Sequence, residues 1–217
     1  AIGFQAGSSA QQDSSVALGY QAGRFSQGLG SGSGQGSAIA IGGYAGYNVQ
    51  ADNAIAIGTS AQLGGSGNAA IAIGYQAGRD IQGPNSVAIG EKAGQIGQGK
   101  QSVAIGSQAG VGLQRSGGIA VGGFAGQNFQ GTGAIAIGNQ AGQISQQEYS
   151  VAIGINSGAF SQSTDGIAIG RGAGNQEQGS KSIAIGRIAG YSSQGAQSIA
   201  IGFNAGYYLQ QNDSVAI

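Results

Sequence analysis

Residues that could carry chemistry are few in this chain and stand far apart. The sequence of 217 residues contains no His and no Cys, which removes the side chains most often used as general bases, nucleophiles and zinc ligands. Eight Asp and Glu residues balance eight Lys and Arg residues. The carboxylates are scattered rather than paired, so no acid–base couple is expected. We predict that the chain is not an enzyme and has no catalytic, cofactor-binding or metal-binding residues.

One segment comes close to a phosphate-binding loop. Gly94, Gly99 and Lys100 follow the order of that motif, but Gln101 stands where Ser or Thr is required. The Gly/Ser run 30–34 lacks the helix that follows the glycines of a dinucleotide-binding turn. We therefore predict no cofactor at either place.

The glycines near Lys100 belong instead to a repeat that covers the chain. The block Ser-Val-Ala-Ile-Gly at residues 86–90 returns at 102–106, and close variants of it occur throughout. The glycines that close the block are spaced by 16 residues, with one interval of 23. They are Gly3, Gly19, Gly42, Gly58, Gly74, Gly90, Gly106, Gly122, Gly138, Gly154, Gly170, Gly186 and Gly202.

The block has the pattern of a short β-strand. Two branched or aliphatic residues flank an Ala in every copy, as Val87 and Ile89 flank Ala88. This period of two, rich in Val and Ile, is typical of a strand that turns the branched pair to one face and Ala to the other. The glycine that follows, such as Gly90, predicts a corner with positive φ.

The second half of each repeat is almost as regular. Ala93, Gly94 and Gln98 represent slots that hold the same residue in nearly every copy. The exceptions are Ser157 in the Ala slot, Gln62 in the Gly slot and Ser66 in the Gln slot. Between the Gly and Gln slots lies a short segment that we interpret as a second, less regular strand, and a polar turn closes the repeat.

A repeat too short for a helical crossover predicts an all-β fold, a parallel β-solenoid or β-roll with 16-residue coils. We expect residues 1–217 to form one continuous solenoid of 13 coils, with residues 29–35 as a loop insertion in one turn. Coils would stack about 4.8 Å apart. We expect the Ile and Val rows to lie inside, and the charged residues, which all occupy variable slots, to face solvent.

Three rows of side chains leave alternatives open. The Ala row either suits a thin coil or packs against another copy of the chain. The Gln row either forms a ladder of stacked amides or binds the backbone of the turns, and a ligand-binding array of amides is a third interpretation. Tyr and Phe in two variable slots, such as Tyr20 and Tyr191, either cover the ends of the sheet or form exposed binding patches.

Composition excludes two classes of partner. A net charge of zero offers no basic surface for nucleic acid. No apolar run reaches the roughly 18 residues of a membrane-spanning helix, so no membrane insertion is expected. The chain starts and stops within the motif, so we expect a segment of a longer fibre.

The Ser-Val-Ala-Ile-Gly block, followed three residues on by Ala-Gly, resembles the head repeats of trimeric autotransporter adhesins. It is also similar to repeats of viral fibre proteins. The resemblance covers every coil and is most specific in the block itself, while the Ala-Gly and Gln slots depart from the family's usual second half. It implies a left-handed parallel β-roll, a homotrimer and attachment to surfaces.

We therefore expect a structural and adhesive fibre segment located outside the cell, on a cell surface or on a virion. Its partner would be itself, as a homotrimer or an end-to-end filament, with a cell-surface receptor or glycan as a further partner. The alternative is an ice-binding β-solenoid, for which the Ala row is the candidate array, since Thr59, Thr132 and Thr164 are unaligned. An enzyme built on a solenoid groove would need clustered carboxylates, which the sequence does not show.

Overall fold

The computed structural model describes residues 1–28 and 36–217, and every regular element in these ranges is a β-strand. The chain divides into two compact units, residues 1–111 and 112–217. Each unit is a parallel β-solenoid of 16-residue coils, which confirms the predicted fold class. The predicted insertion at 29–35 lies outside the described residues.

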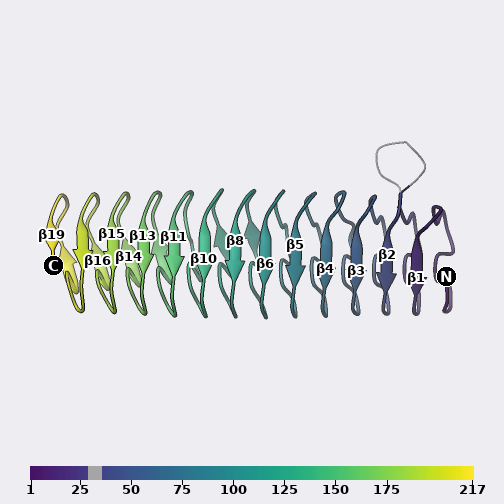
Figure 1. Cartoon of the computed structure of the whole chain (residues 1–217), viewed down its shortest axis with the longest axis horizontal. Helices are drawn as coiled ribbons and strands as arrows, with labels where there is room; N and C mark the ends of the chain where they lie inside the picture. Colours follow the sequence, from purple (N-terminus) through teal and green to yellow (C-terminus); the bar gives the residue numbers. More distant parts are fainter. Residues whose placement is uncertain (29–35) are drawn as a thin grey trace. The chain divides into compact units, whose positions relative to one another are not determined.

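In the first unit, the strand at the start of each coil pairs in parallel with the same strand of the next coil (Figure 1). These strands are β1 (Val16–Leu18), β2 (Ile39–Ile41), β3 (Ile55–Ile57), β4 (Ile71–Ile73), β5 (Val87–Ile89) and β6 (Val103–Ile105). On the opposite side of the coil the Gln slots meet only in isolated bridges, such as Gln82 with Gln98.

In the second unit the corresponding sheet contains β8 (Ile119–Val121), β10 (Ile135–Ile137), β11 (Val151–Ile153), β13 (Ile167–Ile169), β15 (Ile183–Ile185), β17 (Ile199–Ile201) and β19 (Val215–Ala216). The predicted second strand is present here as β7 (Leu113–Gln114), β9 (Phe129–Gln130), β12 (Phe160–Gln162), β14 (Gln176–Gln178), β16 (Ser192–Gln194) and β18 (Tyr208–Gln210). Strands β12, β14, β16 and β18 form a four-stranded parallel sheet, and β7 pairs with β9.

Register is the same in every pair of neighbouring coils. Ile167 pairs with Ile183, Ala168 with Ala184, and Ile169 with Ile185. Hydrogen bonds outside the strands follow the same rule, for example from the Gly94 N–H to the Ala109 carbonyl at 2.9 Å. Each coil therefore satisfies its backbone through its neighbours, as stacked repeats must.

Two glycine slots are fixed by close approaches. At the predicted corner, Gly90 has φ of 126°, and a Cβ there would lie 2.6 Å from the carbonyl oxygen of Gly106. Gly94 has φ of 53°, and a Cβ there would lie 2.7 Å from Oε1 of Gln98. Both positions combine a left-handed backbone with a neighbour that a side chain would strike, so only glycine fits without a shift.

The interior is made of Ala and Gln, which corrects one prediction. The strand residues Ala88 and Ala104 are fully buried, as are Ala93 and Ala109 of the second Ala slot. Val87 and Ile89 lie on the other face of the same strand and are only partly covered. The expectation that the Ile and Val rows lie inside was therefore wrong. The inner face of these strands therefore contributes only the methyl groups of Ala to the interior.

The glutamine row fills the rest of the interior and satisfies both structural interpretations. Nε2 of Gln146 donates to the carbonyls of Ile135 at 2.8 Å and Ser150 at 3.3 Å, so it binds backbone across the coil. The same nitrogen donates to Oε1 of Gln162 at 3.2 Å, so the amides also form a ladder. With these bonds made, a polar side chain can be buried without an unpaired donor.

Two of the three exceptions in the sequence, Gln62 and Ser66, compensate for each other in the structure. Ser66 lacks the amide of its slot, and Gln62, four residues earlier, is fully buried in its place. Nε2 of Gln62 donates to Oε1 of Gln82 at 2.6 Å, and its own Oε1 accepts from Gln50 at 3.5 Å. The ladder therefore continues through a coil that has no Gln in the usual slot.

Candidate functional site

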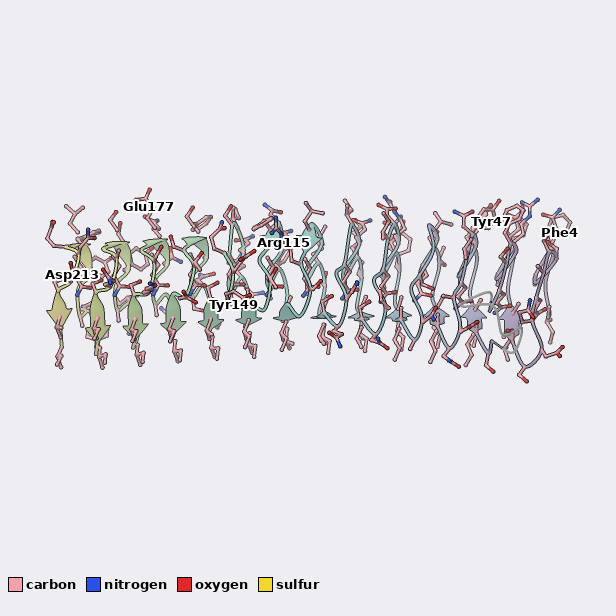
Figure 2. All side chains as sticks on the ribbon, turned by 90° about the horizontal axis from the view of Figure 1, so that it is seen from above. Phe4, Tyr47, Arg115, Tyr149, Glu177 and Asp213 are labelled. Atoms are coloured by element: carbon pink, nitrogen blue, oxygen red, sulfur yellow. The ribbon has the colours of Figure 1, made fainter. Side chains whose placement is uncertain are left out.

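Each unit has an exposed apolar face on the outer side of its Val/Ile-Ala strands, which are β1 to β6 in the first unit and β8, β10, β11, β13, β15, β17 and β19 in the second. We define the Ile/Val stripe as the first and third residues of these strands. Ile89, Ile105 and Ile153 are 36 %, 38 % and 36 % exposed even though equivalent side chains lie above and below them. In each unit, carbon side chains extend outward from these strands, away from the coil interior (Figure 2).

The stripe is uniform because the pairing is in register. Each branched side chain stands next to its counterpart sixteen residues away, as Ile169 does beside Ile185. No charged residue occupies either strand position in any coil. A regular apolar surface of this kind is unlike an ordinary solvated face and is typical of a contact surface.

Burial of the other two rows removes two candidate sites. The strand Ala residues, such as Ala136, are fully buried, so the Ala row cannot present an array to ice. Gln130 and Gln146 are also fully buried, so the amide row is not a ligand-binding surface. The sequence could have indicated that the Ala row is buried. A slot that holds only Ala over many coils is better explained by a small buried space than by exposure to solvent.

Charged residues lie where they were predicted, in the variable slots, and none of them is buried. Arg79 pairs with the adjacent Asp80 at 2.7 Å, and Arg115 pairs with Glu148 at 3.2 Å. Both pairs are partly exposed and contribute little to stability. Lys100, the residue that suggested a phosphate loop, is exposed in a closing turn, and the described residues hold no group of acidic side chains arranged for a metal ion.

Aromatic residues of the variable slots stack on one another outside the coils. In the first unit the rings of Phe4 and Tyr20 lie 5.5 Å apart, and Arg24 lies over the rings of Phe25 and Tyr47. Figure 2 labels Phe4 and Tyr47, which lie along the upper side of these coils in that view. Phe4, Tyr20 and Phe25 are exposed, Phe4 at 63 %, whereas Tyr47 is half-buried. Of the two interpretations, exposure favours surface patches over a cover for the sheet ends.

The second unit carries a similar group. The rings of Tyr191 and Tyr207 are stacked with centroids 5.1 Å apart, and Tyr208 meets Tyr207 edge-on. A hydrogen bond with Tyr208 raises the pKa of the Tyr207 phenol, and a hydrogen bond with Tyr20 similarly raises the pKa of Tyr44 in the first unit. These phenols therefore remain neutral hydrogen-bonding groups throughout the physiological pH range.

One family model matches the start of the chain. Residues 1–22 match the YadA head domain repeat, in two copies. The match supports an adhesin-like structural β-solenoid, and domains of this kind are surface-displayed and typically trimeric. It lies at the start of the first unit, while the same strand and corner pattern continues to the last coil.

The chain matches no curated protein and no solved structure. Within the described residues, no helix is long and apolar enough to cross a bilayer. The similarity to known proteins is therefore confined to the repeat. The surfaces of the two units provide the other evidence on function.

Proposed function

We propose that this chain is a structural, adhesin-like solenoid that is displayed outside the cell and associates with copies of itself through the Ile/Val stripe. The observation that carries the proposal is the stripe, an apolar surface that repeats once per coil and carries no charge. Covering such a surface removes apolar area from water and stabilises the assembly by about 25 cal/mol per Å².

A second copy is the partner that suits the stripe best. The side chains recur at the spacing of stacked strands, and a partner must present apolar groups at the same spacing to cover them all. Another copy of the chain has that spacing by construction, whereas an unrelated globular surface does not. We propose three chains about a common axis, in line with the head-repeat resemblance.

In this proposal the variable slots face outward and carry the contacts with other molecules. The exposed aromatic groups and the scattered charges all lie in those slots. Adhesion would thus vary with residues that the fold does not constrain, while assembly depends on residues that it repeats.

The test is the mass of the chain in solution. We predict a mass three times the 21.0 kDa of one chain by sedimentation equilibrium. The double variant Ile169→Lys with Ile185→Lys places two charges on the stripe, where burial of an unpaired charge opposes association. It should sediment as a monomer and retain its β-sheet circular dichroism spectrum.

The matched control is Gln176→Lys with Ser192→Lys. These residues form a register pair on β14 and β16, on the opposite side of the same coils, so the added charge and its spacing are the same. The control should keep the wild-type mass. A wild-type chain that remains monomeric over the whole concentration range, or a stripe variant that assembles like the control, would refute self-association through this face.

A further inference from the structure

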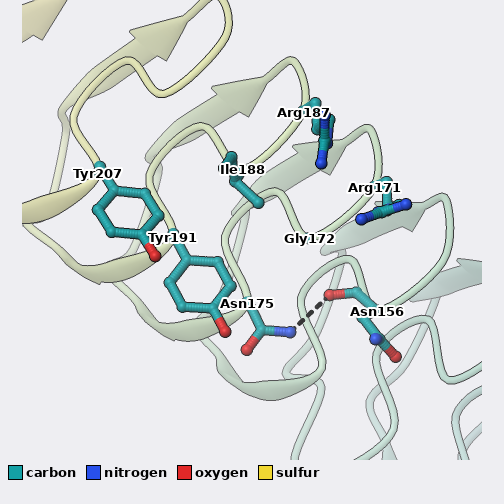
Figure 3. Close-up of a pocket in the computed structure, with 8 residues that line it drawn as sticks. All are labelled: Asn156, Arg171, Gly172, Asn175, Arg187, Ile188, Tyr191 and Tyr207. Atoms are coloured by element: carbon teal, nitrogen blue, oxygen red, sulfur yellow. Dashed lines mark hydrogen bonds between the residues drawn. The ribbon is translucent and has the colours of Figure 1, made fainter.

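The second unit has a polar hollow over the turns that join β13 to β14 and β15 to β16, with Asn156 and Tyr207 contributed by the turns on either side. Its volume is about 300 Å³, and the residues that line it include no Asp or Glu. Arg171 and Arg187 stand on one side and the stacked rings of Tyr191 and Tyr207 on the other (Figure 3). The hollow lies apart from the Ile/Val stripe, so binding of a ligand there does not depend on self-association.

One coil departs from the repeat where it lines the hollow. The second residue after each corner glycine has a left-handed backbone, as in Gln140 with φ of 57° and Asn156 with φ of 56°. Every copy of this slot carries a side chain except Gly172. A Cβ at Gly172 would lie 3.0 Å from Cγ2 of Ile188 and 3.8 Å from the ring of Tyr191. The Ile188 side chain therefore packs directly over Gly172, and any side chain at position 172 would compete with it for the space beside the hollow.

The positive charge at the hollow is not neutralised by the protein. Arg171 and Arg187 occupy the same slot in adjacent coils, and both are exposed. Neither forms an ion pair within the described ranges 1–28 and 36–217, and the guanidinium of Arg187 lies over the ring of Phe203 at 5.5 Å. Two guanidinium groups with free N–H donors make a site for an oxyanion such as a carboxylate or a sulfate.

The opposite side of the hollow carries two stacked tyrosine rings. The rings of Tyr191 and Tyr207 are inclined by only 13° to each other. Asn175 is 6 % exposed, and its Nδ2 donates to the carbonyl oxygen of Asn156 at 2.8 Å, which fixes the amide beside the rings. Aromatic faces pack against the C–H face of a pyranose, while amide and phenol groups bind its hydroxyls.

We propose that this hollow binds an acidic saccharide. Arg171 and Arg187 would bind its carboxylate or sulfate, the sugar ring would lie against Tyr191 and Tyr207, and Asn175 would contact a hydroxyl group. The volume suits one or two sugar units. A lipid or other apolar ligand would leave two guanidinium groups without a counter-charge, and a long polyanion would find no extended basic surface on a chain of zero net charge.

The experiment is titration calorimetry of the whole chain with three matched ligands: lactose, lactose carrying a terminal sialic acid, and lactose carrying a sulfate ester. We expect both acidic sugars, or one of them, to bind at least about tenfold more tightly than lactose, a factor that corresponds to one charge-assisted contact. Which of the two binds identifies the anion as carboxylate or sulfate.

Three variants locate the binding. Gly172→Gln introduces a residue that other coils carry in this slot with the same backbone, so the chain should fold and lose the acidic sugar by filling the hollow. Arg171→Gln with Arg187→Gln should reduce binding to the level of lactose. Arg115→Gln removes one arginine charge at an exposed position outside the hollow. It should leave the affinity for the acidic sugar unchanged.

Several results would overturn the proposal. One is that neither acidic sugar binds more tightly than lactose at millimolar concentration. Another is that Arg115→Gln weakens binding as much as the change of both hollow arginines does. A third is that a tetrapeptide of glutamate binds more tightly than either sugar, which would assign the hollow to acidic peptides. Because the arginine variant does not touch the backbone, the test holds even if Gly172→Gln impairs folding.

Discussion

Single glutamines stabilise a coil that has almost no apolar interior of its own. Gln178 is 1 % exposed, donates to the carbonyl of Ile167 at 2.7 Å and accepts from Gln162 at 3.1 Å. An interior of methyl groups buries little apolar area per residue, so the amide bonds carry a larger share of the stability than in an ordinary core. Removal of one amide takes a hydrogen bond from several buried polar groups at once and leaves a cavity in the interior.

We predict that Gln178→Ala lowers the free energy of unfolding by about 2–4 kcal/mol, the range expected for a buried cavity with unpaired polar groups. Gln176→Ala, two residues earlier on β14 and exposed, is the matched control and should change stability by less than about 0.5 kcal/mol. Urea unfolding followed by circular dichroism measures both. Equal losses in the two variants would show that the amide row does not support the coil.

The interior could be only partly predicted from residues of this kind. The periods of Ala88 and Ile89 reveal a strand with two unlike faces, but a period of two is unchanged when the faces are exchanged. The larger size of Ile and Val then favours the wrong assignment of the two faces, since larger apolar residues usually lie inside. The deciding quantity is the thickness of the coil, which depends on how close Gly94 and Gln98 approach each other, and no local pattern contains that distance.

At the scale of the coil, the Gly and Gln slots form a coupled pair. A side chain in the Gly slot occupies the space of the amide four residues later, as the contact between Gly94 and Gln98 shows. In the coil with Gln62 and Ser66, the same space is filled by an amide that comes from the Gly slot instead of the Gln slot. In the sequence these are two separate exceptions, and only the structure shows that one requires the other.

This coupling predicts a strongly non-additive double-mutant cycle. Ser66→Gln alone puts two amides into one space, and Gln62→Gly alone leaves the ladder without an amide, so each should be destabilising by about 1–3 kcal/mol. The double variant restores the ordinary coil and should unfold close to the wild type. Thermal or urea unfolding of the four proteins gives the coupling, which we expect to exceed about 1 kcal/mol. Additive losses would mean that the two slots are independent.

The hollow at Gly172 shows a second limit of sequence reasoning. Its residues come from three slots of neighbouring coils, and none of those slots is regular enough to attract attention by itself. Arg171 and Arg187 are visible as a pair sixteen residues apart once the coil is known to stack in register. The hollow between them and the tyrosines depends on how residues of several coils pack together, which no motif records.

At the scale of the whole molecule, the repeat separates assembly from recognition. Slots that the coil constrains hold Ala, Gly and Gln inside and Ile or Val on the stripe, and these are nearly constant along the chain. Slots that the coil leaves free contain every charge and the exposed aromatic rings. The predicted solenoid is thus confirmed, while one continuous solenoid, left-handed coiling and membership of a longer fibre stay predictions.

The orientation of the strand faces is the central claim, and thiol labelling measures it directly. The natural chain has no Cys, so the single variants Ala168→Cys, Ile169→Cys and Gln176→Cys report three environments in and beside the same coil. A folded chain should protect the thiol at position 168 and label the thiol at position 176 at every concentration. The thiol at position 169 should react rapidly in dilute, dissociated protein and slowly once copies associate. Protection at position 169 in the isolated monomer, together with rapid labelling at position 168, would contradict the account, because it would place the Ile/Val row inside and the Ala row outside.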